Sequence, residues 1–305
     1  MKKQIYALLL ICCSLTSALQ LLSATQIKKL PIVHAHRGGA AIYPENTIPA
    51  MLHAVEIGVP MLELDLHVTR DSQVVVSHDA YMNPIKALKP NGEEIPIDSA
   101  RMYSIYSMTY DSLKRYDVGS RPNPAFPNRK NLKCSVPLVS DLIDSVEHST
   151  QSKGLCPVGY NIEIKSWPDK DGIYSPDYRT FADLCMRVLL SKNLGDRLLL
   201  QCFDPRTLNY VHEKYPNVRL SYLVEDMAVD FEGLMKRINF VPQVISPNHA
   251  MVDSAFMDKS RKLGMEVAPW TVDEKDEILR LRTLGVDAII TNRPDYVMNW
   301  LKDLP

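Results

Sequence analysis

Three carboxylates and one lysine occur in two short apolar segments. Glu63 and Asp65 are two residues apart in the first, and Glu163 and Lys165 are two apart in the second. Side chains two apart on a β-strand face the same side, so each pair is expected to project together. Buried carboxylates are costly unless a charge compensates them, and Ca²⁺ or Mg²⁺ would do so. We therefore predict one divalent cation on Glu63, Asp65 and Glu163; the alternative is a closed salt-bridge network of Glu163, Lys165, Arg37 and Asp65.

Side chains suited to phosphate chemistry accompany these carboxylates. Arg37 offers a fork of donors that matches a phosphate, and the lysine of the second pair adds a point charge. His36 and His78 are of the residue type that exchanges protons near neutral pH, and we expect His36 to act as base and His78 as acid. A cation, a cationic clamp and two imidazoles suit phosphate ester chemistry. His34 and His67 are expected to be structural.

Alternating strands and helices must position these groups. Parallel strands need crossover connections, and eight such units close into a TIM (β/α)8 barrel, with its active site at the carboxyl ends of the strands. The expected strands are Ile32–His36, Met61–Leu66, Val74–His78, Asn161–Lys165, Leu198–Phe203, Arg219–Val224, Val244–Ser246, Glu266–Thr271 and Ala288–Thr291. The expected helices are Thr47–Ile57, Val139–Glu147, Tyr178–Lys192, Pro205–Lys214, Phe231–Ile238, Asp253–Leu263 and Glu274–Leu284.

Two regions interrupt this alternation. Nine expected strands compete for eight places, so one of them is not an independent barrel strand. The connection between Leu66 and Val74 is too short for a helix, but as an extended segment of about 26 Å it can return outside the barrel, which leaves the third strand parallel. Residues 80–133 are rich in Pro, Asn, Tyr and Arg, and we interpret them as an insertion after the third strand.

The first residues are typical of a secretory signal. Lys2 and Lys3 precede an uncharged apolar run that is too short to span a bilayer. We expect residues 1–24 to be removed, with cleavage near 18 or 24, and residues 30–305 to form a single catalytic barrel domain without a transmembrane segment. Export would place it in the periplasm or outside the cell; lipid attachment at Cys12 or Cys13 is the alternative.

Charge and cysteine content limit the remaining possibilities. The net charge of −1 over 305 residues lacks the basic surplus of a nucleic-acid binder. There is no Cys-x-x-Cys pair, which argues against a zinc or redox site. We expect a disulfide between Cys134 and Cys156, and we expect Cys185 and Cys202 to be buried as small apolar residues.

An ordered series of motifs resembles one known family. The motifs are His36-Arg37-Gly38, Pro44-Glu45-Asn46-Thr47, Glu63-Leu64-Asp65-Leu66, Val76-Ser77-His78-Asp79, Glu163-Ile164-Lys165, Gln201-Cys202-Phe203, Trp270-Thr271-Val272 and Ile289-Ile290-Thr291-Asn292-Arg293-Pro294-Asp295. In order and spacing they resemble the glycerophosphodiester phosphodiesterase family from about Ile32 to Trp300. The resemblance implies a barrel of the phosphatidylinositol phospholipase C type, with an insertion after the His-Asp strand.

The resemblance also implies a role for each matching position. The implied catalytic residues are His36 and His78, and the implied metal ligands are Glu63, Asp65 and Glu163. Arg37 and Lys165 match the phosphate-contacting pair, and Phe203 and Trp270 match aromatic residues that line the substrate cleft. In the second motif, Asn46 or Thr47 is expected to cap the following helix, and Glu45 is expected to brace Arg37.

These observations predict a secreted, metal-dependent glycerophosphodiester phosphodiesterase. Its partner would be a small-molecule glycerophosphodiester, such as glycerophosphocholine, cleaved to glycerol 3-phosphate and an alcohol by histidine acid–base catalysis. The sequence is compatible both with attack by water and with attack by a neighbouring hydroxyl of the substrate. It does not indicate the oligomeric state. The alternatives are a lipid phosphodiesterase of the phospholipase or sphingomyelinase D kind on the same barrel, or a non-catalytic glycerophosphodiester-binding protein.

Overall fold

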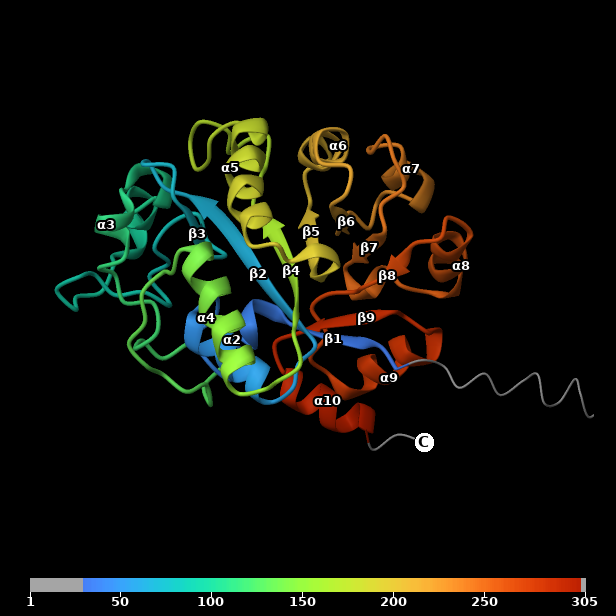
Figure 1. Cartoon of the computed structure of the whole chain (residues 1–305), viewed down its shortest axis with the longest axis horizontal. Helices are drawn as coiled ribbons and strands as arrows, with labels where there is room; N and C mark the ends of the chain where they lie inside the picture. Colours follow the sequence, from blue (N-terminus) through green and yellow to red (C-terminus); the bar gives the residue numbers. More distant parts are fainter. Residues whose placement is uncertain (1–29, 303–305) are drawn as a thin grey trace, which may run out of the picture. The chain divides into compact units, whose positions relative to one another are not determined.

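A ring of parallel strands forms the centre of the barrel unit. The computed structural model describes residues 30–302, and its sheet has the strand order β8-β7-β6-β5-β4-β2-β1-β9 (Figure 1). Every neighbouring pair in this order is parallel. The strands are β1 (Ile32–Ala35), β2 (Met61–Val68), β3 (Val74–Val76), β4 (Gly159–Ile164), β5 (Leu198–Cys202), β6 (Arg219–Val224), β7 (Val244–Pro247), β8 (Glu266–Val267) and β9 (Ala288–Thr291). The predicted TIM barrel is confirmed.

The seam of the barrel lies between β8 and β9. Strand β8 is shorter than expected because Pro269, which has no backbone N–H, interrupts the ladder. The chain nevertheless stays extended beside β9, since the amide of Asp287 donates to the carbonyl of Val267 and the amide of Ile290 donates to the carbonyl of Pro269. These hydrogen bonds nearly close the ring and bring the first and last strands, β1 and β9, side by side.

Helices cover the outer side of the strands and fill the crossovers between them. They are α2 (Ile48–Glu56), α4 (Val139–Ser152), α5 (Tyr178–Ser191), α6 (Pro205–Lys214), α7 (Phe231–Met235), α8 (Ser254–Lys262), α9 (Lys275–Leu284) and α10 (Pro294–Lys302). Aspartate side chains cap several N-termini; Asp204 and Asp253, for example, accept from the amides of Arg206 and Phe256. Our expectations did not include α10, although Pro294 is a typical first helical residue.

Strand β3 is antiparallel to β2, so the expected parallel arrangement is wrong. Leu66 pairs with Val76 and Val68 pairs with Val74. The connection is a tight turn in which Ser72 has a positive φ of 59°, and the amide of Thr69 donates to the carbonyl of Gln73. A hairpin forms where an external return was expected because five residues suffice to join antiparallel strands. Thus β3 is the strand outside the barrel order.

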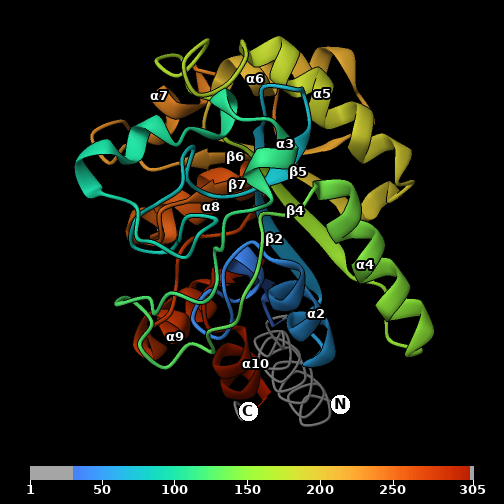
Figure 2. The same ribbon diagram turned by 90° about the vertical axis from the view of Figure 1, so that its left-hand side faces the viewer.

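The segment between β3 and α4 forms a small layer of its own. It contains the 3-10 helices η2 (Ile97–Met102) and η3 (Ile105–Ser107) and the short helix α3 (Tyr110–Leu113). Its buried apolar side chains form, with Val75 of β3, a cluster separate from the main core: Met82, Ala87, Ile95, Ala100, Ile105, Leu113 and Val136. In Figure 2 this cyan-to-green segment crosses in front of the strands. The insertion is therefore packed structure rather than a loose loop.

The expected disulfide between Cys134 and Cys156 is wrong. Both cysteines are free, with Cys134 buried and Cys156 exposed. They flank opposite ends of α4, whose 14 residues extend about 21 Å, whereas the Cα atoms of a disulfide lie about 4.4–6.8 Å apart. Cys185 and Cys202 are buried in the main apolar core, as expected.

The expectations for the first residues lie outside the part of the chain that the structure describes. These are the signal peptide over 1–24 and the lipid attachment at Cys12 or Cys13. Among residues 30–302, none of the helices combines the length and the apolar character needed to cross a bilayer.

Candidate active site

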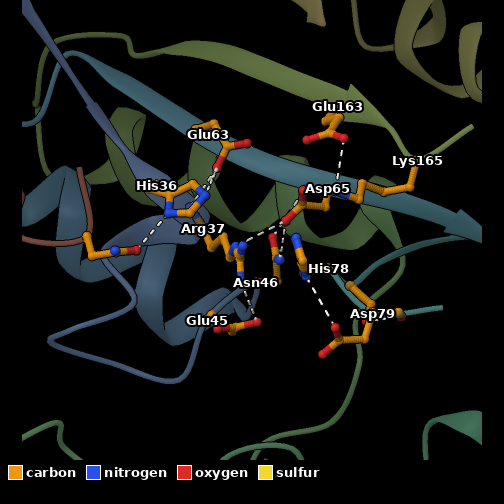
Figure 3. Close-up of polar contacts among 12 residues, drawn as sticks. His36, Arg37, Glu45, Asn46, Glu63, Asp65, His78, Asp79, Glu163 and Lys165 are labelled. Atoms are coloured by element: carbon orange, nitrogen blue, oxygen red, sulfur yellow. Dashed lines mark hydrogen bonds and ion pairs between the residues drawn. The ribbon is translucent and has the colours of Figure 1, made fainter. Parts of the chain in front are cut away.

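A cluster of three buried carboxylates lies at the carboxyl ends of β2 and β4. Register explains it, because Asp65 of β2 pairs with Glu163 of β4, and Glu63 lies two residues earlier on the same face. One carboxylate oxygen from each of Glu63, Asp65 and Glu163 lies within 4.8 Å of the others. Figure 3 shows the three side chains, with Lys165 beside them.

Glu63 is held by two donors from different strands. Its Oε2 accepts from the backbone amide of Arg37 at 2.8 Å, and its Oε1 accepts from Nε2 of Gln201 at 2.8 Å. Burial, followed by the charge of Asp65, raises the pKa of the Glu63 carboxyl well above its usual value. Without a compensating cation, this carboxyl therefore favours its protonated form.

Asp65 is oriented by Asn46, which is not the helix cap considered above. Nδ2 of Asn46 donates to Oδ2 of Asp65 at 2.8 Å, and the amide of Asp65 donates to Oδ1 of Asn46 at 3.2 Å. Asn46 adopts a left-handed φ of 57°, which asparagine tolerates well. The cap of α2 is Thr47, whose side chain accepts from the amide of Ala50.

Two cations face Asp65 and Glu163. Nζ of Lys165 lies 2.9 Å from Oε1 of Glu163 and 3.6 Å from Oδ1 of Asp65, and Nε of Arg37 lies 3.6 Å from Oδ2 of Asp65. Burial would raise the pKa of Asp65, but Lys165, His78 and Arg37 outweigh it and hold that pKa well below its usual value. Burial outweighs Lys165 at Glu163 and raises its pKa to about 7.

The cluster retains unused capacity for a cation. Within the described residues, the buried atoms Oδ1 of Asp65 and Oε1 of Glu163 accept no well-oriented hydrogen bond despite the nearby lysine. Oxygens on opposite sides of a Ca²⁺ ion lie about 5 Å apart, so the 4.8 Å separation suits one ion. The salt-bridge network that we considered as an alternative is present, yet it leaves these oxygens unsatisfied. The carboxylates Glu63, Asp65 and Glu163 therefore fit a hard divalent cation.

His36 follows β1 and is fixed by a side chain from beyond β9. Its Nδ1 lies 2.7 Å from Oδ1 of Asn292, and its Nε2 lies 4.0 Å from Oε2 of Glu63. The Asn292 amide is held in turn by Asp273, which accepts from its Nδ2 and its backbone N, both at 2.8 Å. Burial, followed by the charge of Arg37, lowers the pKa of His36 to about 3, so the ring is neutral.

His78 follows the β2–β3 hairpin, which places its ring beside the carboxylate cluster. Strand β3 runs back toward the barrel, and the amide of Ser77 donates to the carbonyl of Asp65 at 2.9 Å. Nδ1 of His78 lies 3.3 Å from Oδ1 of Asp79 (Figure 3). The ring is partly exposed, with 32% of its side-chain surface accessible. This position is compatible with proton exchange between the ring and a bound molecule.

The other two histidines have supporting positions. Nε2 of His67 lies 3.2 Å from the backbone carbonyl of His78, and burial lowers the pKa of His67 to about 4. Nδ1 of His34 lies 3.3 Å from Nδ2 of Asn161, and burial, followed by Arg219, lowers the pKa of His34 to about 3. Both rings are buried and neutral inside the fold.

Arg37 occupies an unusual backbone conformation beside the cluster. Its φ is 53°, a left-handed value that costs energy for a residue with a side chain. Nη1 of Arg37 donates to Oε1 of Glu45 at 3.1 Å, in agreement with the expected brace. The next residue, Gly38, also has a positive φ, and a Cβ there would lie 2.9 Å from Cβ of Ala50, so glycine permits this turn to pack on α2.

Aromatic side chains border a cavity above the cluster. The rings of Phe203 and Trp270 meet edge to face at 5.4 Å, and Trp167 stacks on Phe203 at 5.1 Å. Nε1 of Trp270 donates to the carbonyl of Ser246 at 2.9 Å. The lining residues include His36, Arg37, Glu63, Asp65, His78, Glu163, Lys165, Gln201, Phe203, Leu223, Trp270, Thr271 and Ile290. The structure thus brings every site residue expected from the sequence to one cavity.

Several residues that organise this cavity were not assigned a role from the sequence. Gln201 and Asn292 lie within the motifs quoted above, whereas Asn161 and Asp273 lie outside them. Asn161 joins the site because its Nδ2 donates to Oε1 of Gln201 at 3.0 Å. Strand parity was the available signal for Asn161, since it lies two residues before Glu163 on β4. Asp273 lies in a loop, where no such periodicity applies.

The parallel barrel, with a carboxylate cluster at the carboxyl ends of its strands, places the protein in the class of (β/α)8-barrel enzymes. Residues 36–296 match the Glycerophosphoryl diester phosphodiesterase family. The chain is 26% identical over 271 residues to a glycerophosphodiester phosphodiesterase of Caldanaerobacter subterraneus, which covers 89% of this chain and 98% of that protein. The chain belongs to the glycerophosphoryl diester phosphodiesterase family, and it is a phosphoric diester hydrolase.

Solved structures have the same fold. A phosphodiesterase of Oleispira antarctica, in complex with the product sn-glycerol-3-phosphate, is similar with a TM-score of 0.71 and 19% identity, covering 90% of this chain and 98% of that one. A glycerophosphodiester phosphodiesterase of Parabacteroides distasonis is similar with a TM-score of 0.66 and 22% identity, covering 90% and 98%.

Proposed function

We propose that this chain is a metal-dependent glycerophosphodiester phosphodiesterase that releases glycerol 3-phosphate and an alcohol, with glycerophosphocholine as a representative substrate. The observation that supports this most directly is the convergence of three carboxylate oxygens within 4.8 Å beside two histidines and two cations. Family membership supports the same reaction, and the product bound to the Oleispira enzyme contains the glycerol phosphate arm.

Glu63, Asp65 and Glu163 would hold the cation, Ca²⁺ or Mg²⁺. When bound, such an ion stabilises negative charge on a phosphoryl oxygen. Arg37 and Lys165 would bind the phosphate of the substrate, because both cations reach the rim of the carboxylate cluster. Phe203 and Trp270, which also line the cavity, would contact an ester arm of the substrate.

His36 is suited to the role of base. An amide oxygen only accepts hydrogen bonds, so the contact with Oδ1 of Asn292 requires a proton on Nδ1 of His36. The free electron pair is then on Nε2, which lies on the side of Glu63 and the cavity. The lowered pKa keeps this nitrogen unprotonated, so His36 would accept the proton of the attacking hydroxyl or water.

His78 is suited to the role of acid. Its Nδ1 contacts a carboxylate, that of Asp79, instead of a neutral amide. The carboxylate can accept a hydrogen bond from Nδ1, and in this role the other ring nitrogen would donate a proton to the leaving alkoxide. The two histidines thus differ in the partner of Nδ1, which supports the assignment of His36 as base and His78 as acid.

Charge balance favours a diester over a monoester. A divalent cation cancels two of the three carboxylate charges, and Arg37 with Lys165 then leaves the centre with a net charge of about +1. One phosphodiester charge balances it, whereas a phosphomonoester brings nearly two. We therefore expect diesters with a glycerol arm to be hydrolysed and glycerol 3-phosphate to be left intact.

A lipid diester is the second candidate substrate. The insertion exposes Ile97 and Met102, which have 79% and 80% of their surfaces accessible, and exposed apolar side chains can contact acyl chains or a membrane surface. The small diester remains our proposal because most of the residues that line the cavity above the cluster are polar or charged.

A substrate panel tests the proposal. The purified protein would be incubated with glycerophosphocholine, glycerol 3-phosphate and a diacyl phospholipid at equal concentration with Ca²⁺ or Mg²⁺. We expect glycerophosphocholine to release glycerol 3-phosphate and choline, and we expect the other two compounds to remain intact. Preferential cleavage of the phospholipid would replace the proposal with the lipid phosphodiesterase, and turnover of none of the diesters would reject it.

We also propose that the protein is exported. Support comes from Lys2 and Lys3 ahead of a short apolar run. Mass spectrometry of the protein from the cell envelope is expected to find a mature terminus near Leu19 or Thr25. A cytoplasmic chain that retains Met1 would contradict export without affecting the catalytic proposal.

A further inference from the structure

Lys86, in the insertion, lies between the carboxylates that support two different site residues. Its Nζ lies 2.5 Å from Oδ2 of Asp79 and 2.7 Å from Oε1 of Glu45. Asp79 contacts the ring of His78, and Glu45 accepts from Arg37. An unbroken chain of charged contacts therefore runs from the ring of His78 through Lys86 to the guanidinium of Arg37.

The insertion fixes Lys86 through a turn and its own small core. The amides of Lys86 and Ala87 both donate to the carbonyl of Asn83, at 3.0 and 2.8 Å, and Ala87 is buried in the cluster of the insertion. Nδ2 of Asn83 adds a donor to Oδ2 of Asp79 at 3.0 Å. The same turn thus presents two donors to one carboxylate oxygen.

Burial makes these contacts stronger than surface ion pairs. The Lys86 side chain is 17% exposed and that of Glu45 is 11% exposed. Burial alone would raise the pKa of Glu45, but Arg37 and Lys86 lower it to about 2. Burial would likewise lower the pKa of Lys86, but Glu45 and Asp79 raise it. Both partners are therefore ionised at neutral pH and poorly screened by solvent.

We propose that Lys86 is a positioning residue, which holds the carboxylate of Asp79 where it aligns His78 for protonation of the leaving group. This inference rests on the proposed function, and it gives the insertion a part in the chemical step. Without Lys86, the Asp79 carboxylate keeps the amide of Asn83 but loses its closest cation, and the partly exposed ring of His78 loses a fixed partner. If Lys86 only tied the insertion to the barrel, its loss would instead lower the stability of the fold and would lower kcat equally for all substrates.

Leaving groups of different basicity separate these two roles. Choline leaves as a strongly basic alkoxide that needs a proton, whereas nitrophenolate leaves without one. The experiment compares kcat for glycerophosphocholine with kcat for the p-nitrophenyl ester of glycerol 3-phosphate. The variants are Lys86→Met, which removes the charge, Lys86→Arg, which keeps it, and the control Lys89→Met, which removes a lysine that pairs with Glu93 in the same insertion.

We expect Lys86→Met to lower kcat for glycerophosphocholine about tenfold to hundredfold, less than the factor of about 10² to 10⁴ for loss of the general acid itself, and to lower kcat for the nitrophenyl ester less than about threefold. Lys86→Arg should recover most of the loss, and Lys89→Met should match the wild type. If Lys86→Met fails to fold by circular dichroism, Lys86→Gln takes its place with the same expectations.

Three results would overturn the inference: equal losses for both substrates, no loss for either, or the same loss in Lys89→Met. Each of them leaves the proposed function intact as long as the wild type hydrolyses glycerophosphocholine. A wild type that cleaves neither ester would reject the proposed function, and the inference with it.

Discussion

Asn292 and His36 are 256 residues apart in the sequence, yet Oδ1 of Asn292 lies 2.7 Å from Nδ1 of His36. The amide cannot be reversed without cost, because its Nδ2 donates to the carboxylate of Asp273. Reversal would place an NH₂ group against Nδ1 and an oxygen against a carboxylate. The pair Asp273 and Asn292 thus selects the Nδ1–H tautomer of His36.

Loss of this selection should slow the reaction. Asn292→Ala removes the acceptor, so we expect both tautomers of His36 to be populated and kcat to fall about tenfold or more. The measurement is kcat for glycerophosphocholine together with ¹⁵N chemical shifts of the imidazole. The control is Asn239→Ala at an exposed position, and unchanged ring shifts in Asn292→Ala would refute tautomer selection.

Metal removal should abolish activity. Glu63, Asp65 and Glu163 repel one another without a cation, so chelation is expected to stop turnover and Ca²⁺ or Mg²⁺ to restore it. Glu63→Gln should weaken cation binding in isothermal titration calorimetry by about tenfold or more, whereas the exposed Glu213→Gln should not. Full activity in excess chelator would contradict this prediction.

Removal of either histidine of the cavity should affect kcat far more than folding. We expect His36→Ala and His78→Ala each to lower kcat by about 10² to 10⁴, with thermal unfolding nearly unchanged. His148→Ala, at an exposed position on α4, serves as the control. His67→Ala loses a buried ring and its contact with the His78 carbonyl, so it should lower kcat less than His78→Ala; an equal loss of kcat would reject the assignment of His67 as structural.

Acid should destabilise the fold through its buried histidines. The pKa of His34 is about 3 in the folded protein and about 6.5 when unfolded, so below pH 6.5 the unfolded chain binds a proton that the folded chain does not. The free energy of unfolding then falls by about 1.4 kcal/mol per pH unit for this residue. Urea denaturation at pH 7.5 and 5.5 gives the free energy of unfolding at each pH. Between these two values, its decrease should be about 1.4 kcal/mol smaller in His34→Gln than in the wild type, and an equal decrease in both proteins would contradict the prediction.

Strand periodicity was enough to predict the carboxylate cluster. The spacing of two between Glu63 and Asp65 fixed their common face, and the parallel pairing of β2 with β4 placed Glu163 opposite Asp65. Both follow from the alternation of side chains along a strand. The alternation of short apolar segments with helical segments likewise predicted the barrel, and the apolar segments predicted β6 and β9 with the bounds that the structure shows.

Contacts made by turns and loops could not be predicted in this way. The antiparallel direction of β3 depends on a tight turn at Ser72. Strand β2 extends to Val68, beyond its expected end at Leu66, and the five residues that remain before β3 can join only antiparallel neighbours. Asn46, Asp273 and Lys86 act from irregular segments, where spacing does not indicate which way a side chain points. Of the two expected caps of α2, Thr47 takes that role, and nothing in the sequence indicated the contact of Asn46 with Asp65, which depends on the left-handed backbone of Asn46.

The pairing of β1 with β9 makes the surroundings of His36 depend on the last strand of the barrel. A nascent chain that ends before Ala288 already contains all three carboxylates, both histidines and the insertion. It lacks the strand that shields β1 and the amide that sets the tautomer of His36. Such a chain carries the carboxylates of β2 and β4, but the contact that fixes Nδ1 of His36 forms only when β9 and the residue that follows it are present. Deletion of the residues from Ala288 onward would therefore remove part of the site, and not only one strand of the barrel.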